Sequence, residues 1–338
     1  MSATNHDRPR RIAVVTGGSA GVGRAIVREL AAHGYDVAVL ARGHAGLDGA
    51  VKDVENAGAR GLGVPTDVAD LGHVRAAAAQ VEAELGPIDL WVNTAFVGAL
   101  RFFWDTDDEL YRRITDVTYF GYVNGTRVAL DLMRRRDHGT IVQVGSALAY
   151  RGIPLQSAYC GAKHAIKGFT ESVIAELKHD KSKVHISMVE LPGVNTPQFD
   201  WNDNAFDKHP MPVPPIFQPE VAARAVRFVA EHRRRNMWVG PPTAKTILGN
   251  RVAPWFLDWY LGRKGVQGQL SDQDGPRFGA NAFTARDDDR DVGAHGMFDD
   301  QARSGDPWSW TSMHRSALSA GAVVAAVSAT AAARRLRR

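Results

Sequence analysis

The chain has little cysteine and no long apolar run near its N-terminus. Its single cysteine, Cys160, excludes an internal disulfide framework and a multi-cysteine zinc site, so we predict no metal centre and a reducing compartment. The first apolar run, Ile12 to Val15, is too short for the hydrophobic region of a secretory signal and continues into glycines. These absences together predict a cytoplasmic location.

The chain also lacks a charge excess outside its C-terminus. It holds 41 Lys and Arg against 37 Asp and Glu, and four of the arginines lie within residues 331–338. Without those four, basic and acidic residues balance at 37 each. A nucleic-acid partner requires a basic face on the folded domain rather than a basic tail. We therefore expect no nucleic-acid partner.

What is present is a regular alternation of apolar strands and helical segments. Strands are expected at Arg11–Val15, Tyr35–Leu40, Leu62–Thr66, Ile88–Asn93, Thr140–Gly145, Val184–Glu190 and Met237–Gly240. The segments between them have helical length, including long ones near 106–136 and 157–180. This alternation predicts an α/β fold in which a doubly wound parallel sheet, the Rossmann fold, is covered by helices on both faces.

The composition changes along the chain and predicts four parts. They are a flexible N-terminus at 1–10, the α/β domain at 11–240, a partly irregular extension at 241–315, and an uncharged helix candidate with a basic tail at 316–338. The extension holds a group of aromatic residues, followed by a stretch rich in Gly, Asp and Arg that shows no periodicity.

A glycine-rich turn joins the first strand to the first helix. Glycines at Gly17, Gly21 and Gly23 allow a sharp turn and a close approach to a diphosphate, and the following helix offers free N–H groups. A turn with no ligand is the alternative. At the end of the second strand, Ala41 offers no carboxylate, whereas Arg42 offers a cation for a 2′-phosphate. This pattern favours NADP(H) over NAD(H), unless Arg42 is only a solvated surface residue.

A candidate acid–base site is formed by Ser146, Tyr159 and Lys163, which follow later in the chain. Tyr159 and Lys163 are four residues apart in a helical segment, so both project from one face. A nearby ammonium favours the phenolate, and Ser146, just after a strand, could hydrogen-bond a carbonyl or its developing oxyanion. Taken singly, each residue has an ordinary surface explanation.

These motifs resemble the short-chain dehydrogenase/reductase family in its single-domain branch. Thr16–Gly23 is similar to that branch's T-G-x-x-x-G-x-G, Tyr159–Lys163 to its Y-x-x-x-K, and Ser146 stands where the family keeps its catalytic serine. The resemblance covers about 11–240 and implies that Tyr159 exchanges the proton, Lys163 holds the nicotinamide ribose, and Ser146 orients the substrate. The cofactor-binding residues predicted from the turn and the resemblance are Thr16, Gly17, Ser19, Gly21, Val22, Gly23, Arg42, Asp67, Val68, Asn93, Ala95, Tyr159, Lys163, Pro192, Gly193 and Thr196.

Two positions depart from the family pattern. The motif N-N-A-G is similar to Asn93–Phe96, where Phe96 replaces the glycine, and Thr118 stands where the family has a helix asparagine that supports a proton relay. Thr118 can serve if only its backbone carbonyl is needed. The predicted function is an NADP(H)-preferring oxidoreductase that acts on a carbonyl/alcohol pair. The alternative is a catalytically weak or inactive cofactor-binding scaffold or sensor at a membrane, and a sugar-nucleotide epimerase is disfavoured by the glycine spacing.

The substrate and the partners are less constrained. Asn195–Pro219 carries six prolines and four aromatic residues, which predicts either a lid over an apolar substrate or a loop anchored by its rings. The run Ser316–Ala333 could lie on a membrane surface with the basic tail on anionic headgroups, span the membrane, or remain in solution, and residues 308–338 include two tryptophans suited to an interface. The resemblance implies a homo-oligomer formed through the helices near 106–136 and 157–180.

Overall fold

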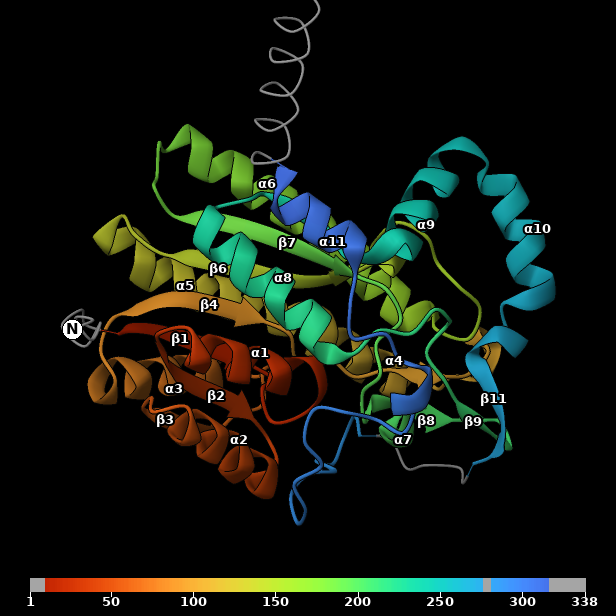
Figure 1. Cartoon of the computed structure of the whole chain (residues 1–338), viewed down its shortest axis with the longest axis horizontal. Helices are drawn as coiled ribbons and strands as arrows, with labels where there is room; N and C mark the ends of the chain where they lie inside the picture. The colour runs from red at the N-terminus through yellow and green to blue at the C-terminus, as the bar shows by residue number, and fades with distance from the viewer. Residues whose placement is uncertain (1–9, 276–280, 316–338) are drawn as a thin grey trace, which may run out of the picture.

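The computed structural model describes residues 10–275 and 281–315, and its centre is a parallel sheet of seven strands in the order β10-β7-β6-β4-β1-β2-β3 (Figure 1). Every neighbouring pair in this sheet is parallel. The strands are β1 (Arg11–Thr16), β2 (Tyr35–Ala41), β3 (Gly61–Pro65), β4 (Ile88–Asn93), β6 (Thr140–Ser146), β7 (His185–Leu191) and β10 (Asn236–Trp238). The predicted doubly wound α/β fold is confirmed.

Helices cover both faces of this sheet, which explains why the central strands are apolar along their whole length. The residues that α1, α2 and α8 bury form one core, and those that α3, α4, α5 and α6 bury form the other. Figure 1 shows α1 and α8 crossing one face side by side. The helices are α1 (Gly21–Ala32), α2 (His44–Asn56), α3 (Leu71–Glu84), α4 (Asp108–Thr115), α5 (Gly121–Arg136), α6 (Ser157–His179) and α8 (Pro219–His232).

The segment expected as one helix near 106–136 is interrupted. Between α4 and α5, residues Asp116–Phe120 form a π-helical turn. Within this turn the Thr118 hydroxyl donates to the Val97 carbonyl (3.0 Å) and accepts from the Val97 N–H (3.1 Å). A single π turn inside a helix is common at functional sites, because it shifts the side chains on either side of it.

The chain continues beyond the sheet into elements that surround its carboxyl edge. Two small sheets pair β5 (Ala99–Leu100) with β8 (Asp203–Asn204), and β9 (Lys208–Pro210) with β11 (Leu270–Asp274). The remaining helices are α7 (Gln198–Trp201), α9 (Gly240–Val252), α10 (Pro254–Lys264), α11 (Pro307–Met313) and the short 3-10 turns Phe103–Asp105, Ala147–Ala149, Gln267–Gln269 and Asp299–Gln301. The α9–α10 pair projects from the body (Figure 1), and α10 buries none of its residues.

Residues 281–299, which we call the C-terminal strap, run back across the α/β domain without regular structure until the short turn at their end. The strap is anchored by apolar side chains, because Ala282, Ala294 and Phe298 are all buried. It was expected only as a loop, and its packing against the domain was not anticipated.

The predicted membrane segment falls almost wholly outside the described residues. Residues 316–338, like residues 1–9, are not described. Of the two upstream tryptophans, Trp308 donates from its indole N–H to the Trp238 carbonyl (3.2 Å), and both rings are exposed. None of the helices within residues 10–275 and 281–315 combines the length and the apolar character needed to cross a membrane.

Candidate active site

One large cavity, of about 970 Å³, lies at the carboxyl edge of the sheet. Strand order reverses there, since β1 has β2 on one side and β4 on the other, and open α/β sheets bind ligands at such a point. The glycine-rich turn, the ends of β4, β6 and β7, and the first turns of α6 all contribute to its wall. Most of the residues predicted as catalytic or cofactor-binding therefore converge at one place.

The glycine-rich turn has a backbone that only glycine tolerates. Gly17 and Gly21 have φ of +66° and +56°. A Cβ on Gly17 would lie 2.6 Å from the Cα of Ala95, and one on Gly23 would lie 2.1 Å from the Gly17 carbonyl oxygen. The turn is thus closed against β4 behind it, while Gly17, Ser19, Gly21, Val22 and Gly23 line the cavity in front. This cradle at a helix N-terminus fits the diphosphate of a dinucleotide.

Ser146, Tyr159 and Lys163 meet on the opposite wall. Ser146 ends β6, and Tyr159 and Lys163 lie one turn apart on α6. The Ser146 hydroxyl is hydrogen-bonded to the Tyr159 phenol, and that bond partly offsets the rise in the Tyr159 pKa that burial causes. The Lys163 ammonium lies 5.6 Å from the centroid of the Tyr159 ring. All three residues line the cavity, so they can contact a bound substrate and cofactor.

Two oxygen atoms accept hydrogen bonds from the Lys163 ammonium. Its Nζ donates to the Val144 carbonyl (2.8 Å) and to the hydroxyl of Tyr122 (3.1 Å), and that hydroxyl itself donates to Val144 (2.8 Å). Burial lowers the pKa of Lys163 to about 7, and the charge of Glu190 opposes this shift. Tyr122 lies fully buried on α5, and no sequence motif indicated it.

Glu190 is a second side chain beside the candidate site that no sequence motif indicated. It is fully buried on β7, and burial raises its pKa to about 7, while Lys163 and the backbone N–H of Ser146 oppose the rise. Its Oε2 accepts no hydrogen bond from any described residue. One signal was available, because a carboxylate inside an otherwise apolar buried strand needs a reason.

The two departures from the family pattern have defined places. Phe96 lies against Tyr159, with ring centroids 5.5 Å apart and planes at 60°, so it forms part of the cavity wall beside the Tyr159 phenol. Thr118 does not line the cavity, and its hydroxyl is hydrogen-bonded to the backbone N–H and carbonyl of Val97. Lys163 instead donates a hydrogen bond to Tyr122, which lies four residues after Thr118, in the first turn of α5.

The adenosine end of the cavity involves Asp67, Val68 and Arg42. Arg42 donates from Nη1 to the Ala282 carbonyl (2.9 Å) and from Nη2 to the Asn281 carbonyl, so it is not the solvated side chain of the alternative interpretation. Burial, followed by the charge of Arg113, lowers the Arg42 pKa. Arg113 itself bridges the Asp67 carboxylate and the Ala282 carbonyl.

Two of the predicted cofactor-binding residues support the cavity without lining it. The Thr16 hydroxyl accepts hydrogen bonds from the N–H groups of Thr94 (3.1 Å) and Ala95 (3.4 Å) and so fixes the loop after β4. Asn93 donates to Gln143 Oε1 (2.9 Å) and accepts from the Trp91 indole (2.9 Å), inside the core. The cavity is lined, in contrast, by Asp67, Val68, Ala95, Pro192, Gly193 and Thr196.

The proline-rich segment contributes only some of its aromatic rings to the cavity. Phe199 and Trp201 line it, whereas Phe217 is buried in the core and Phe206 packs against Phe102 at 5.9 Å. The residues Phe103 and Trp104 are exposed. This end of the cavity is also walled by apolar side chains of other segments, namely Ile153, Met211, Val213, Leu257 and Leu261.

Comparison with known proteins agrees with this geometry. The family model described as short chain dehydrogenase matches residues 11–205, which is more than half of the chain. The chain belongs to the short-chain dehydrogenase/reductase family. It is an NAD(P)-dependent oxidoreductase with the Rossmann fold.

Among its relatives, an uncharacterized oxidoreductase YxnA of Bacillus subtilis is 30% identical over 250 residues, which is 73% of this chain and 70% of that protein. A 3-dehydrosphinganine reductase of Danio rerio is 31% identical over 191 residues, covering 55% of this chain and 57% of the relative.

Solved structures share the fold at lower identity. A short-chain dehydrogenase/reductase of Burkholderia phymatum in complex with NAD superposes with a TM-score of 0.66 at 22% identity, over 73% of this chain and 95% of that one. An alcohol dehydrogenase of the archaeon Thermococcus sibiricus, complexed with 5-hydroxy-NADP, has a TM-score of 0.56 at 22% identity, over 68% and 94% of the two chains.

Proposed function

We propose that this short-chain dehydrogenase/reductase interconverts an apolar carbonyl compound and its alcohol, with Tyr159 as the proton donor or acceptor. One observation carries the proposal: the Ser146–Tyr159–Lys163 group faces a single cavity that has the glycine-rich turn at one end and an apolar wall at the other. A nicotinamide cofactor held by the glycine-rich turn and Lys163 would supply or accept the hydride. The chain's own residues supply the proton, the orientation and the apolar surroundings.

The proton step follows from the surroundings of Tyr159. Burial raises the pKa of its phenol, so the isolated side chain would remain protonated near neutral pH. A charged Lys163 beside it favours the phenolate, and the Ser146 hydroxyl is placed to hydrogen-bond the substrate oxygen together with Tyr159. A protonated Tyr159 gives its proton to a developing alkoxide, and the phenolate takes one from an alcohol.

The alternative of an inactive cofactor-binding protein has less support. Phe96 leaves the acid–base group intact, because the Ser146–Tyr159 hydrogen bond is formed beside it. Thr118 lacks the family's amide, but Tyr122 contacts Lys163 from the same helical region. Oligomerisation through α5 and α6 and association with a membrane surface remain predictions.

The cofactor preference depends on charged side chains of both signs that line the cavity, namely Arg42, Arg286 and Asp287. Arg42 supports the NADP(H) preference predicted from the sequence, because a guanidinium suits a 2′-phosphate. Asp287, from the strap, lines the same end of the cavity and carries the opposite charge. A preference for NADP(H) requires that Arg42 face the 2′ position, and a preference for NAD(H) requires that Asp287 do so.

The test is turnover by Tyr159→Phe. The reduction of ketones, steroids, acyl thioesters and quinones is screened with NADPH and NADH, and the best pair is used for the variants. We expect kcat to fall by about 10²- to 10⁴-fold while the dissociation constant of the nucleotide changes less than threefold. Tyr111→Phe removes a hydroxyl outside the cavity and should leave both values unchanged. Full turnover by Tyr159→Phe would reject the assignment.

A further inference from the structure

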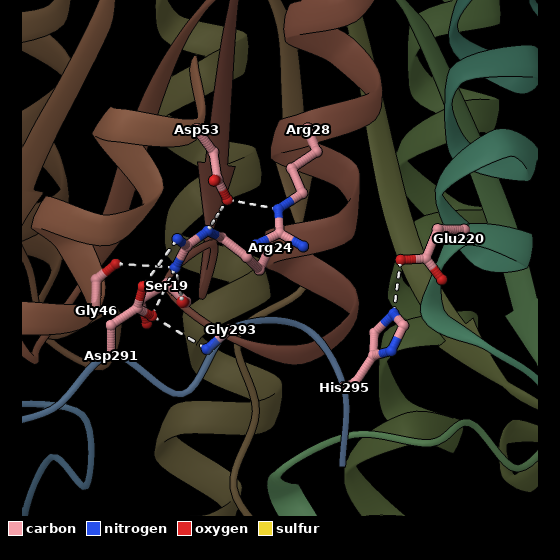
Figure 2. A network of polar contacts seen from close by, with 9 residues as sticks. All are labelled: Ser19, Arg24, Arg28, Gly46, Asp53, Glu220, Asp291, Gly293 and His295. Atoms are coloured by element: carbon pink, nitrogen blue, oxygen red, sulfur yellow. Dashed lines mark hydrogen bonds and ion pairs between the residues drawn. The ribbon is translucent and has the colours of Figure 1, made fainter. Parts of the chain in front are cut away.

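The C-terminal strap lies outside the region that the family model matches, yet it packs on the dinucleotide end of the cavity. Figure 2 shows its main anchor: Asp291 pairs through both carboxylate oxygens with the buried Arg24 of α1 (2.9 and 3.1 Å). The Gly293 carbonyl accepts from the Gly21 N–H of the glycine-rich turn (3.0 Å). Further along, His295 contacts Glu220 of α8 (2.8 Å).

The strap also occupies the N-terminus of α2, which follows the strand end at Arg42. The first N–H groups of a helix attract anions such as a phosphate. Here the N–H of His44 donates to the Asp288 carboxylate (2.9 Å), that of Ala45 to the Asp288 carbonyl (3.0 Å), and that of Gly46 to the Asp287 carbonyl (2.9 Å). These three donors are therefore engaged by the strap.

Four strap residues line the cavity, and two of them are charged: the exposed Arg286 and the buried Asp287. The side chain of Asp287 lines the cavity and is 5% exposed, and its Oδ2 accepts no hydrogen bond from any described residue. A Cβ on Gly43 would lie 2.1 Å from Asp287 Oδ1, and one on Gly46 would lie 2.2 Å from Oδ2. The two glycines therefore leave room for this carboxylate. A buried acceptor with no donor costs free energy, which a hydroxyl donor would recover wherever it can reach the carboxylate from the cavity.

Arg42, in contrast, already has partners on the strap. Both of its terminal nitrogens donate to the strap's backbone carbonyls, at Asn281 and Ala282. The Arg42 guanidinium thus joins the strap to the end of β2 at the adenosine end of the cavity. A 2′-phosphate would have to take it from these carbonyls and would lie beside the Asp287 carboxylate.

We propose that Asp287 is the acceptor for the adenosine ribose hydroxyls of the dinucleotide and that it makes the protein prefer NAD(H) over NADP(H). The carboxylate that Ala41 does not provide at the end of β2 thus comes from the C-terminal strap. A ribose 2′-hydroxyl donates to Asp287, whereas the anionic 2′-phosphate is repelled by it. The proposal rests on the proposed function, since it needs a dinucleotide in this cavity, and it departs from the NADP(H) preference predicted from Arg42.

The experiment measures the binding of NAD⁺ and NADP⁺ by titration calorimetry, without substrate, on the full chain. The wild type, Asp287→Ser and the control Asp289→Ser are compared. Asp289 is exposed and lies two residues away, so its substitution removes the same charge from the same strap. We expect the wild type to bind NAD⁺ more tightly, and Asp287→Ser to shift the ratio of the two dissociation constants towards NADP⁺ by about 10- to 100-fold. Asp289→Ser should shift it less than threefold.

Two outcomes would overturn the proposal: tighter binding of NADP⁺ by the wild type, and an unchanged ratio in a folded Asp287→Ser. Tighter NADP⁺ binding that is lost in Arg42→Ala would assign the preference to Arg42 instead. If Asp287→Ser fails to fold by circular dichroism, Asp287→Asn keeps the shape, removes the charge and should shift the ratio in the same direction. Binding of neither nucleotide by the wild type would refute the proposed function itself, whereas binding of both with an unchanged ratio refutes only the role of Asp287.

Discussion

Glu190 makes the stability of this protein depend on pH in a way that one substitution should remove. Its carboxyl group is fully buried between Lys163 and Ser146, and burial raises its pKa from 4.5 to about 7. In the variant Glu190→Gln, an uncharged amide of nearly the same shape takes its place. The comparison therefore isolates the free energy of ionising a carboxyl group at this site.

The magnitude follows from the pKa. Because the folded-state value lies above the unfolded one, the wild type's stabilisation by the protonated Glu190 is fully present below pH 4.5 and is lost as the pH rises through about 7. The rise from 4.5 to about 7 corresponds to about 3 kcal/mol, at about 1.4 kcal/mol per pH unit. Glu190→Gln should thus exceed the wild type by no more than about 1 kcal/mol at pH 5 and by up to about 3 kcal/mol at pH 8.5.

The assay is urea unfolding of both proteins at pH 5 and pH 8.5, followed by tryptophan fluorescence, with the midpoint and slope compared at each pH. Glu55→Gln, on the exposed side of α2, is the control. Its free energy of unfolding should differ from that of the wild type by the same small amount at both pH values. A Glu190→Gln protein that is destabilised equally at both pH values would refute the reasoning. That result would mean that the pKa of Glu190 is the same in the folded and the unfolded protein, so that burial does not raise it.

Three further substitutions test the support of the site and the packing of the helices. Tyr122→Phe removes the hydroxyl that accepts a hydrogen bond from Lys163. We therefore expect kcat to fall about tenfold at similar KM, and the limb of the pH–rate profile that reports Lys163 to move to lower pH. An unchanged pH–rate profile would mean that Tyr122 has only a structural role. Gly125→Ala places a Cβ 2.2 Å from Asn93 Oδ1 and should lower the free energy of unfolding by about 1–3 kcal/mol, whereas Gly168→Ala, exposed on α6 with open space around it, should raise it by about 0.5–1 kcal/mol. Urea unfolding measures both glycine variants, and equal shifts would contradict this account.

Much of the central fold could be predicted because its signals are local. The strand β7 was expected at Val184–Glu190 and lies at His185–Leu191, and the helix α6 was expected near 157–180 and lies at Ser157–His179. Buried parallel strands are apolar along their length and are bounded by turns, so short windows of sequence reveal them. The break between α4 and α5 was missed; the π turn there coincides with hydrogen bonds between Thr118 and the distant Val97, which no short window of sequence contains.

The candidate site divides in the same way. The spacing of Tyr159 and Lys163 on one helix, and the glycines after β1, are local patterns with a chemical meaning. Tyr122 and Glu190 come from two other elements, and only their packing brings them to Lys163. Their roles could not be predicted from spacing along the chain.

The sequence by itself therefore determined the order of strands and helices, the glycine-rich turn and the acid–base group, because each is encoded by neighbouring residues. Only the tertiary structure decided what surrounds the adenosine end of the cavity. The contact of Arg24 with Asp291 joins residues 267 positions apart, in a segment with no periodicity to announce it. Such a contact depends on the complementarity of buried charge and shape, which exists only once the strap and the α/β domain are packed together.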